Sequence, residues 1–479
     1  MKKRIISAIT AILALACLAG CSENGGASSA AGGGQSSDNS TSSTNSTNST
    51  SSTDLTSSDN SSSETSSSSS TESDAQSSSD KTESSSPEES SAPVPVEVGS
   101  SAGCGELTPV EITADNKVNS IRLFDVISQG KENSMFSPLS LNMALGLLAE
   151  GAGGGSKSAL DAYLGTDDYS GFADGYMQLV ESEYNYIPES YYDSDWKSVF
   201  ELANSFWANN SLPFKEDYKN ALTEKFKAEI RNIDFGNKEK ALGEINGWVS
   251  DKTHKMIPSI INDYSDDIAA VLINTIYFES AWADRWYINE DNKQTFTLAD
   301  GSTKEIPLMH NGGDSYFEND KATAFSCGYI NGLKFIGILP KETGDFSIES
   351  LDIPSLLESG SREYDVYAAM PKLEFETEIP LTETLKAFGL SEIFDENAAD
   401  FSGISDVPLF VSEVLQKTKL ELDEYGTKAA AVTAAMMDTM GVMPVERETR
   451  EVTLDRPFAF MIYDDAQDQI VFLGKVTNP

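Results

Sequence analysis

An abrupt change in composition close to residue 106 limits where a folded core can form. Residues 22–106 are dominated by serine, with threonine, asparagine, glycine and scattered acids, as in SSSETSSSSSTESDAQSSSDKTESSS. Such a segment buries too little apolar surface to offset the entropy lost on ordering, so we expect a disordered linker. Residues 107–479 have a globular composition without a second linker. About 370 residues can bury a large core, which predicts one large domain over 107–479.

The first 21 residues have the layout of a lipoprotein-type signal peptide. A basic start, MKKR, precedes an apolar run over residues 5–18 that is too short to span a membrane comfortably. The run ends in LAGC, which resembles a bacterial lipoprotein cleavage site with Cys21 as the lipidated residue. Several acyl chains would anchor the protein stably at the extracellular face of a bacterial cell membrane. An ordinary secretion signal, giving a secreted protein, is the alternative.

Charge and cysteine spacing argue against nucleic acid and against a metal. Lys and Arg total 34 against 76 Asp and Glu, a formal net charge of −42, whereas nucleic-acid binding needs basic patches. Beyond Cys21 only Cys104 and Cys327 remain. An extracellular setting permits them to pair, but the sequence does not predict that disulfide. No metal-ligand spacing or CxxC pattern occurs, and we expect no cofactor.

Helix patterns come first in the domain and strand patterns later. NKVNSIRLFDVISQG has apolar residues at helical spacing, and FSPLSLNMALGLLAEG begins with Ser137 as N-cap and Pro138 in the first turn. IAAVLINTIYF is nearly continuously apolar, which is typical of a strand buried on both faces. Similar runs follow: GLKFIGILP, EYDVYAAMPKLEF, TLDRPFAFMIY and QIVFLGKV. This order predicts an α+β fold with large sheets.

The enzyme motifs that the sequence would need are missing. The two histidines are His254, expected in a helix, and His310, expected just after a strand. Neither lies in a nucleophile motif, and GxSxG and HExxH do not occur. The glycine run EGAGGGSKS lacks the Gly-Lys pair of a phosphate-binding loop and is interpreted as a helix end. We predict that the protein is not an enzyme.

Eight pieces of the domain, in order, resemble the serpins, serine protease inhibitors that trap their targets by changing shape. The resemblance covers about Thr113 to Pro479. It implies the serpin fold: α+β, with three β-sheets, about eight or nine helices and an exposed reactive-centre loop. The pieces are NSMFSPLSLNMALGLLAEGA, LANSFWA, INGWVSDKTHKMI, LINTIYFESAW, TFTLADGSTKEIPLMH, MPKLEFETEIPLTETLKAFGLSEIFDENAADFSGIS, LELDEYGTKAAAVTAA and DRPFAFMIYD with IVFLGKVTNP.

By this resemblance the reactive-centre loop is residues 422–446, LDEYGTKAAAVTAAMMDTMGVMPVE. Its first part later enters the main sheet as a strand. Alternate side chains of a strand face opposite sides. One set, from Thr427 to Ala435, is small and uncharged, and the other holds a single charge, Lys428. Overpacking a sheet costs about 1–3 kcal/mol per site, and no proline occurs before Pro444. The implied hinge residues are Glu424, Gly426, Thr427, Ala429, Ala430, Ala431 and Thr433.

The family's spacing, counted from Gly426, places the scissile bond at Met440–Gly441. As a strand, residues 427–440 would span about 45 Å, close to the roughly 50–55 Å width of such a domain. Met440 would suit elastase-, chymotrypsin- or subtilisin-like proteases. The distance from Met440 to Pro457 is longer than usual, so other positions stay open. These are Met437, Met443 and Arg447, the last of which would suit trypsin-like proteases.

The implied mechanism is suicide inhibition. The target's serine attacks the carbonyl carbon of Met440 and forms an acyl-enzyme. Loop insertion then drags the acyl group away from the target's histidine and oxyanion hole, so deacylation stalls. The implied partner is a serine protease held covalently, with papain-like cysteine proteases as a further class. The inhibitor is expected to be a monomer.

Other matching positions correspond to two regions of the family's main sheet. Ser137, Ser140 and Asn274 correspond to the shutter, where strands part, and Trp282 to the breach, where insertion begins. The shutter position usually held by His is Gln416 here, which donates and accepts hydrogen bonds without a proton switch. Lys428 replaces a common acid, and we discount it because it lies on the more tolerant face of the loop.

The competing function is a non-inhibitory serpin-fold protein that binds partners at the cell surface. In the family, bulky, inward-charged or proline residues in the hinge accompany loss of inhibition. Residues 426–435 contain none of these. The hinge therefore favours inhibition.

Overall fold

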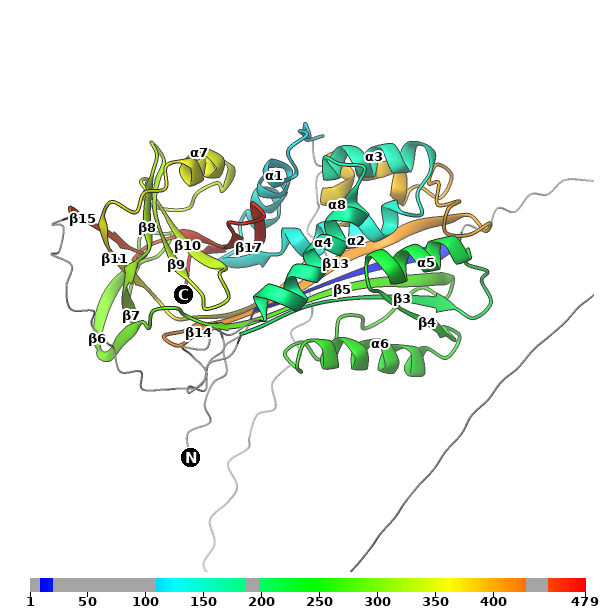
Figure 1. Ribbon diagram of the computed structural model, residues 1–479, viewed down its shortest axis with the longest axis horizontal. Helices are drawn as coiled ribbons and strands as arrows, with labels where there is room; N and C mark the ends of the chain where they lie inside the picture. Colours follow the sequence, from blue (N-terminus) through cyan, green and yellow to red (C-terminus); the bar gives the residue numbers. More distant parts are fainter. Residues whose placement is uncertain (1–8, 20–108, 186–197, 428–446) are drawn as a thin grey trace, which may run out of the picture. The chain divides into compact units, whose positions relative to one another are not determined.

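The computed structural model describes residues 9–19, 109–185, 198–427 and 447–479. This part of the chain holds three sheets and eight α-helices, which confirms the predicted α+β class (Figure 1). The α-helices are α1 (Asn116–Ser128), α2 (Pro138–Ala149), α3 (Gly154–Leu164), α4 (Tyr169–Leu179), α5 (Glu216–Lys225), α6 (Lys238–Lys252), α7 (Ile353–Glu358) and α8 (Thr382–Leu385). Shorter helical turns are η1 (Val180–Tyr184), η3 (Glu349–Leu351), η4 (Lys386–Leu390) and η5 (Ser391–Phe394).

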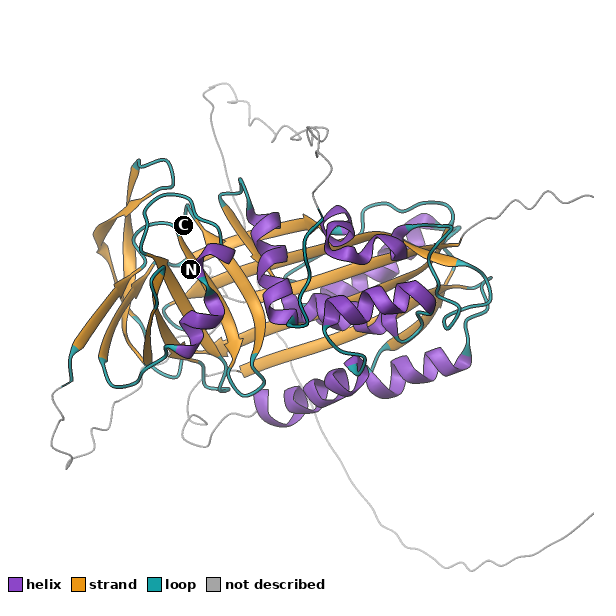
Figure 2. Cartoon of the chain, turned by 90° about the horizontal axis from the view of Figure 1, so that it is seen from above, coloured by secondary structure: helices purple, strands orange, loops and turns teal. Residues whose placement is uncertain are grey.

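The largest sheet, here called the main sheet, has seven strands. Figure 2 shows its long strands side by side, with helices lying across them. β14 and β1 together occupy the strand position between β13 and β5, here called the slot. From edge to edge the strands are β12 (Leu373–Pro380), β13 (Leu409–Asp423), β14 (Gly426–Thr427) with β1 (Ile9–Ala19), β5 (Ile268–Ala281), β3 (Ser198–Asn209) and β4 (Glu229–Ile233).

β5 is the central strand of the main sheet. All of its residues are buried, as its apolar sequence predicted. Because successive side chains point to opposite faces, the strand joins two cores. Val271 and Ile273 pack with apolar residues of α6, whereas Leu272 and Ile276 belong to the larger core on the side of α2. In Figure 1, α6 accordingly lies on one face of the sheet and α2 on the other.

Two strands share the slot, one after the other. Thr427 of β14 pairs with Ser280 on β5 and Leu422 on β13. Ile9, the first residue of β1, pairs two positions further along both strands, and β1 is drawn in blue between them in Figure 1. Both occupants are antiparallel to β5 and β13. Residues 9–19 also belong to the predicted signal peptide, and the removal of that peptide stays a prediction.

Two further sheets complete the described structure. One has six strands: β2 (Asn133–Phe136), β17 (Gln469–Val476), β16 (Phe458–Asp464), β10 (Lys334–Pro340), β9 (Ala322–Gly328) and β8 (Ser315–Glu318). The other has four: β15 (Thr449–Thr453), β11 (Asp365–Met370), β7 (Thr303–Gly313) and β6 (Tyr287–Thr297).

Local signals in the sequence explain several element ends and miss others. Ser137 caps α2, because its hydroxyl accepts a hydrogen bond from the backbone N–H of Ser140, with Pro138 in the first turn. His254 is not in a helix as expected, since α6 ends at Lys252 and His254 adopts a positive φ of 50°. His310 lies within β7 rather than after it.

Candidate functional site

The site begins where the main chain turns from β13 into the slot. Gly426 has a φ of +144°, a backbone region that L side chains rarely adopt. A Cβ at this position would lie 2.3 Å from the carbonyl oxygen of Ser280 and 2.7 Å from Cα of Ala281. Both contacts are with backbone, so they cannot be relieved by a rotamer change. The hinge glycine is therefore required by the close approach of β5.

Thr427 lies fully buried at the end of the slot where the chain enters from β13, against a group of aromatic rings. Its hydroxyl is 2.9 Å from the hydroxyl of Tyr329. The Tyr329 ring stacks on Trp282, with centroids 4.4 Å apart. The Trp282 indole N–H donates to the carbonyl of Asp423, 2.9 Å away, at the end of β13. The predicted breach residue thus contacts β13 directly and is linked to Thr427 through Tyr329.

An ion pair holds the turn between β13 and β14. Lys372 Nζ lies 2.9 Å from Oε2 of Glu424 and 2.9 Å from Oε1 of Glu290. Burial lowers the pKa of Lys372, but the hydrogen bonds from the two carboxylates outweigh it and raise the pKa overall. The side chain of Glu424 is only 15% exposed, so this contact is better shielded than an ordinary surface pair.

The predicted shutter residues lie together further along the slot, away from Thr427. The N–H of Ser137 donates to Gln416 Oε1 at 2.8 Å, and Gln416 Nε2 donates to the carbonyl of Ser137 at 3.1 Å. The Ser137 hydroxyl donates to the carbonyl of Val471 at 2.7 Å. Ser137 and Gln416 are fully buried. These bonds join β13, the start of α2 and β17.

A second chain of hydrogen bonds runs from α2 to β3. The hydroxyl of Ser140 donates to Asn274 Oδ1 at 2.6 Å. Asn274 Nδ2 then donates to Asn204 Oδ1 at 2.8 Å, and Asn204 Nδ2 donates to the carbonyl of Phe226 at 2.8 Å. Since Gln416 sits on β13 and Asn274 on β5, the network is anchored to both walls of the slot. It can hold the slot's width while leaving the strand position itself free of cross-links.

The structure brings together the predicted hinge, breach and shutter residues that it describes. Gly426, Thr427 and Glu424 surround the slot entrance, and Arg447 is exposed where the chain returns toward β15. Other predicted positions lie outside the described residues: Cys21, Ala429, Ala430, Ala431, Thr433, Met437, Met440, Gly441 and Met443. Cys327 is buried, and its potential partner Cys104 also lies outside the described residues.

Sequence reasoning missed three residues of the site. Tyr329, Lys372 and Asn204 contact predicted residues but lie far from them in the chain. Lys372 lies within the strand-like run EYDVYAAMPKLEF, but its charge alone does not indicate its partner. Asn204 lies in the piece LANSFWA, but that piece does not indicate which residue Asn204 contacts, and Tyr329 lies in none of the eight pieces. Only the sheet pairing shows that these positions converge.

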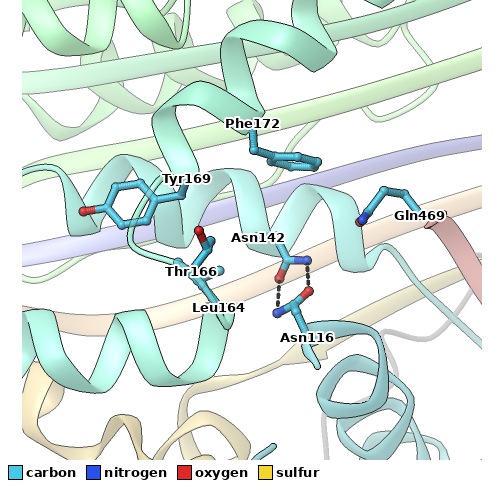
Figure 3. A pocket seen from close by; sticks show the side chains of 7 residues that line it. All are labelled: Asn116, Asn142, Leu164, Thr166, Tyr169, Phe172 and Gln469. Carbon is cyan, nitrogen blue, oxygen red and sulfur yellow. Dashed lines mark hydrogen bonds between the residues drawn. The ribbon is translucent and has the colours of Figure 1, made fainter. Parts of the chain in front are cut away.

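The described residues also form a small pocket away from the slot, at the ends of α1 and α3 (Figure 3). Its volume is about 240 Å³, below the roughly 300–1,000 Å³ typical of ligand pockets. Asn116 and Asn142 exchange two hydrogen bonds of 3.3 and 2.5 Å, and Tyr169 accepts one from Lys157 at 3.0 Å. Its polar side chains are therefore largely satisfied by one another.

Within the described ranges, other classes of site find little support. The described residues contain no group of three or more His, Cys, Asp and Glu side chains that could hold a metal ion. His254 contacts Glu201, and His310 contacts Gln294 and Tyr367. None of the helices described is both long enough and apolar enough for a membrane crossing.

Comparison with known proteins agrees with this geometry. Residues 114–479 match the family model described as Serpin (serine protease inhibitor). The chain is 31% identical over 380 residues to an uncharacterized serpin-like protein of Thermococcus kodakarensis, which covers 76% of this chain and 85% of that protein.

Solved structures give the same result. The native state of the thermophilic serpin tengpin matches with a TM-score of 0.64 and 28% identity, over 78% of this chain and 96% of that one. Thyroxine-binding globulin in complex with thyroxine matches with a TM-score of 0.63 and 25% identity, over 76% and 98% of the two chains. The chain belongs to the serpin family, a family of serine protease inhibitors.

Proposed function

We propose that this protein inhibits extracellular serine proteases by a conformational trap, with Met440–Gly441 as the scissile bond. The observation that carries the proposal is the slot. β14 already enters it, and its pairing with β5 and β13 defines the register that the rest of the loop would follow. A strand added there would gain main-chain hydrogen bonds on both sides.

The lengths of β5 and β13 support Met440 as the residue attacked. Each step forward along the loop is one step back along β13, because the pairing is antiparallel. Continued without a bulge, this register brings Met440 opposite Leu409, the first residue of β13, and one position beyond Ile268, the first of β5. The register of β1 shifts by one residue against each wall beyond Ala16, and by that register Met440 would lie one position beyond Leu409. Cleavage after Met440 would thus let the loop fill the sheet from one end to the other. Met437 would stop short of that end, and Met443 would overrun it.

β1 supports the view that the slot accepts a long strand. Its residues pair with both β5 and β13, and from Ile9 to Ala16 they keep the register that the loop would have. The same backbone positions can therefore be filled by either of two uncharged segments whose residues differ. Along this stretch of the slot, main-chain pairing rather than one particular side chain holds the strand.

The decisive experiment combines the chain with proteases of the predicted classes. Among the residues whose burial the structure describes, the two core clusters begin at Ile121, so a chain that begins at Ser22 keeps all of these residues and lacks β1. It would be mixed with an elastase-like and a subtilisin-like protease and examined on a denaturing gel. A stable band at the summed mass, with a released peptide that begins at Gly441, is the expected result.

Other outcomes separate the alternatives. A peptide that begins after Met437, Met443 or Arg447 would move the scissile bond while leaving the trap intact. Cleavage without a stable complex across a broad panel, including trypsin-like and papain-like proteases, would contradict inhibition. The non-inhibitory surface-binding function would then be the better proposal.

We further propose that the inhibitor acts at the outer surface of a bacterial cell. The support is the lipoprotein-like LAGC site at Cys21 and the Ser-rich segment after it. A flexible linker of about 84 residues has a reach of roughly 50 Å, enough to hold the domain clear of surface polymers. Labelling with a radioactive fatty acid, lost in a Cys21→Ser variant, would test the anchor.

A further inference from the structure

A rung is here one row of paired residues across β5, the slot and β13. One rung of the slot is flanked by two carboxylates. Beyond the rung of Thr427, the next position along β5 is Glu279 and the next along β13 is Glu421. β1 begins at the rung after this one, with Ile9. The two acidic residues therefore lie on opposite walls of the slot, at the first position that the advancing loop must fill.

Both acidic side chains belong to the face of the main sheet that carries α6. Thr427 points to the other face, where its hydroxyl contacts Tyr329, and side chains alternate along a strand. On the α6 face, the Tyr277 hydroxyl donates to Glu279 at 2.9 Å. The Tyr277 ring lies against His254, just after α6, with centroids 4.3 Å apart. The rung after Thr427 thus opens toward a partly covered surface.

This surface is acidic and poorly solvated. Glu279 is only 6% exposed, and the side chain of Glu421 is 14% exposed. Burial is the largest cause of the raised pKa of Tyr277, and Glu279, Glu201 and Glu421 add to it. Lys419 contacts Glu421 at 2.7 Å, which shows that an ammonium group from a strand can reach this carboxylate.

We infer that Glu279 and Glu421 form a binding rung for the ammonium group of Lys428 in the inserted loop, an inference that rests on the proposed function. Lys428 follows Thr427 directly, so it meets this rung first. Opposed residues on neighbouring strands have Cβ atoms about 4.5–5.5 Å apart, within easy reach of a lysine side chain. Hydrogen bonds between ionised partners are about twice as strong as neutral ones.

The pairing gives a reason for the presence of Lys428 at a position where the family commonly has an acid. An acid at position 428, as is common in the family, would place three carboxylates on one rung here. Like charges directly opposite one another destabilise a sheet. Lys428 instead matches both walls and acts as a positioning residue that secures the first step of insertion.

The test compares the heat stability of each variant before and after its loop is cut. The chain beginning at Ser22 is nicked in its loop by limited digestion with a metalloprotease, a class that forms no acyl-enzyme. It is then melted, with the uncut form as its own reference. We expect wild type and Lys428→Arg to gain most in Tm on cutting. Lys428→Gln should gain less by a few degrees, and Lys428→Glu least. In protease trapping, Lys428→Glu should raise the number of inhibitor molecules consumed per complex severalfold.

Exchanging the charges of Lys428 and Glu421 tests whether Lys428 acts through its charge. A merely structural role of Lys428 would not respond to this exchange. Adding Glu421→Lys to Lys428→Glu restores opposite charges on the rung and should recover most of the lost Tm gain. The matched control is Glu413→Lys in the same background. Glu413 is exposed on β13, eight residues before Glu421, too far from the rung to neutralise it. It should recover nothing.

Failure of this inference and failure of the proposed function give different results. Equal Tm gains for the four residues at position 428, or recovery by Glu413→Lys, would overturn the rung while leaving insertion intact. A wild-type chain that gains no heat stability on cutting would overturn insertion itself, and the rung with it.

Discussion

Gln416 satisfies both backbone groups of Ser137 at once: its amide oxygen accepts from the Ser137 N–H, and its amide nitrogen donates to the Ser137 carbonyl. Replacing it by methionine keeps the length but removes donor and acceptor. Each orphaned buried group costs about 1–3 kcal/mol. We expect Gln416→Met to lower Tm by several degrees in calorimetry.

The histidine variant at the same position tests the missing proton switch. A neutral imidazole donates and accepts once, so Gln416→His should be milder than Gln416→Met above pH 7. Protonation near its usual pKa of about 6.5 removes the acceptor. The Tm of Gln416→His should therefore fall relative to wild type as the pH drops from 7.5 to 5.5. A constant difference across that range would contradict the assigned hydrogen bonds.

Gly426→Ala should damage the hinge severely. The new Cβ would meet the backbone of Ser280 and Ala281 in a strained φ region, and strain of this kind costs about 1–3 kcal/mol before any clash is relieved. We expect a lower Tm and little or no trapping. The matched control is Gly243→Ala in α6, where a Cβ meets nothing within 4 Å. That change should stabilise by up to about 1 kcal/mol.

Loss of the Lys372–Glu424 ion pair should shorten the life of the inhibitory form. Lys372→Met frees the turn between β13 and β14, and about 1 kcal/mol corresponds to a roughly fivefold change in rate. Residual trapping would be followed during incubation at 37 °C. Lys341→Met, which removes a comparably exposed lysine from the Lys341–Glu318 pair far from the slot, is the control and should leave the half-life unchanged.

Glu229 should make the attachment of α6 sensitive to acid. Burial opposes its ionisation, but hydrogen bonds from Lys252 at the end of α6 and from Arg231 lower its pKa to about 2. A pKa below the unfolded value adds stability above about pH 4.5, and this stability is lost as the pH falls toward 2. The Tm difference between wild type and Glu229→Gln should be positive at pH 6 and shrink by pH 3. A difference independent of pH would refute the ion pair.

The uncleaved precursor should trap proteases poorly. β1 and the inserted loop need the same positions between β5 and β13. The full chain should therefore yield more cleaved inhibitor per complex than the chain beginning at Ser22. Adding Ala11→Pro, which removes a ladder donor from β1, should restore trapping to the full chain. Equal trapping by all three proteins would show that β1 does not compete.

The sequence predicted those parts of the fold whose signals are local. The apolar run of β5 and the capped start of α2 carry their own evidence, and both are confirmed. The family's motif order supplied the positions of Ser140, Asn274 and Trp282. It could not supply Lys372 or Tyr329, because ion pairs and stacked rings depend on pairing between distant segments.

The same limit explains one wrong expectation. His310 was expected to follow its strand, but a polar residue on the half-exposed face of β7 is compatible with continued pairing. The discounting of Lys428 rests on the pattern of its own segment alone, and it stays a prediction because Lys428 lies outside the described residues. Its acidic neighbours in the slot belong to β5 and β13, and no local pattern brings them together.

β13 and β14 are joined by only Glu424 and Tyr425, so together they are the first rungs of a hairpin. Hairpins form in about 1–10 μs, faster than most large domains fold. The residues after Thr427 are thus the nearest competitors for the edge of β13 from the moment the chain is made. If the loop is to remain exposed to a protease, its pairing with β13 must stop after the first residues while the other strands of the sheet pair. The form with the exposed loop is then kinetically stable rather than lowest in free energy. Its yield depends on the relative rates of sheet closure and loop pairing during folding.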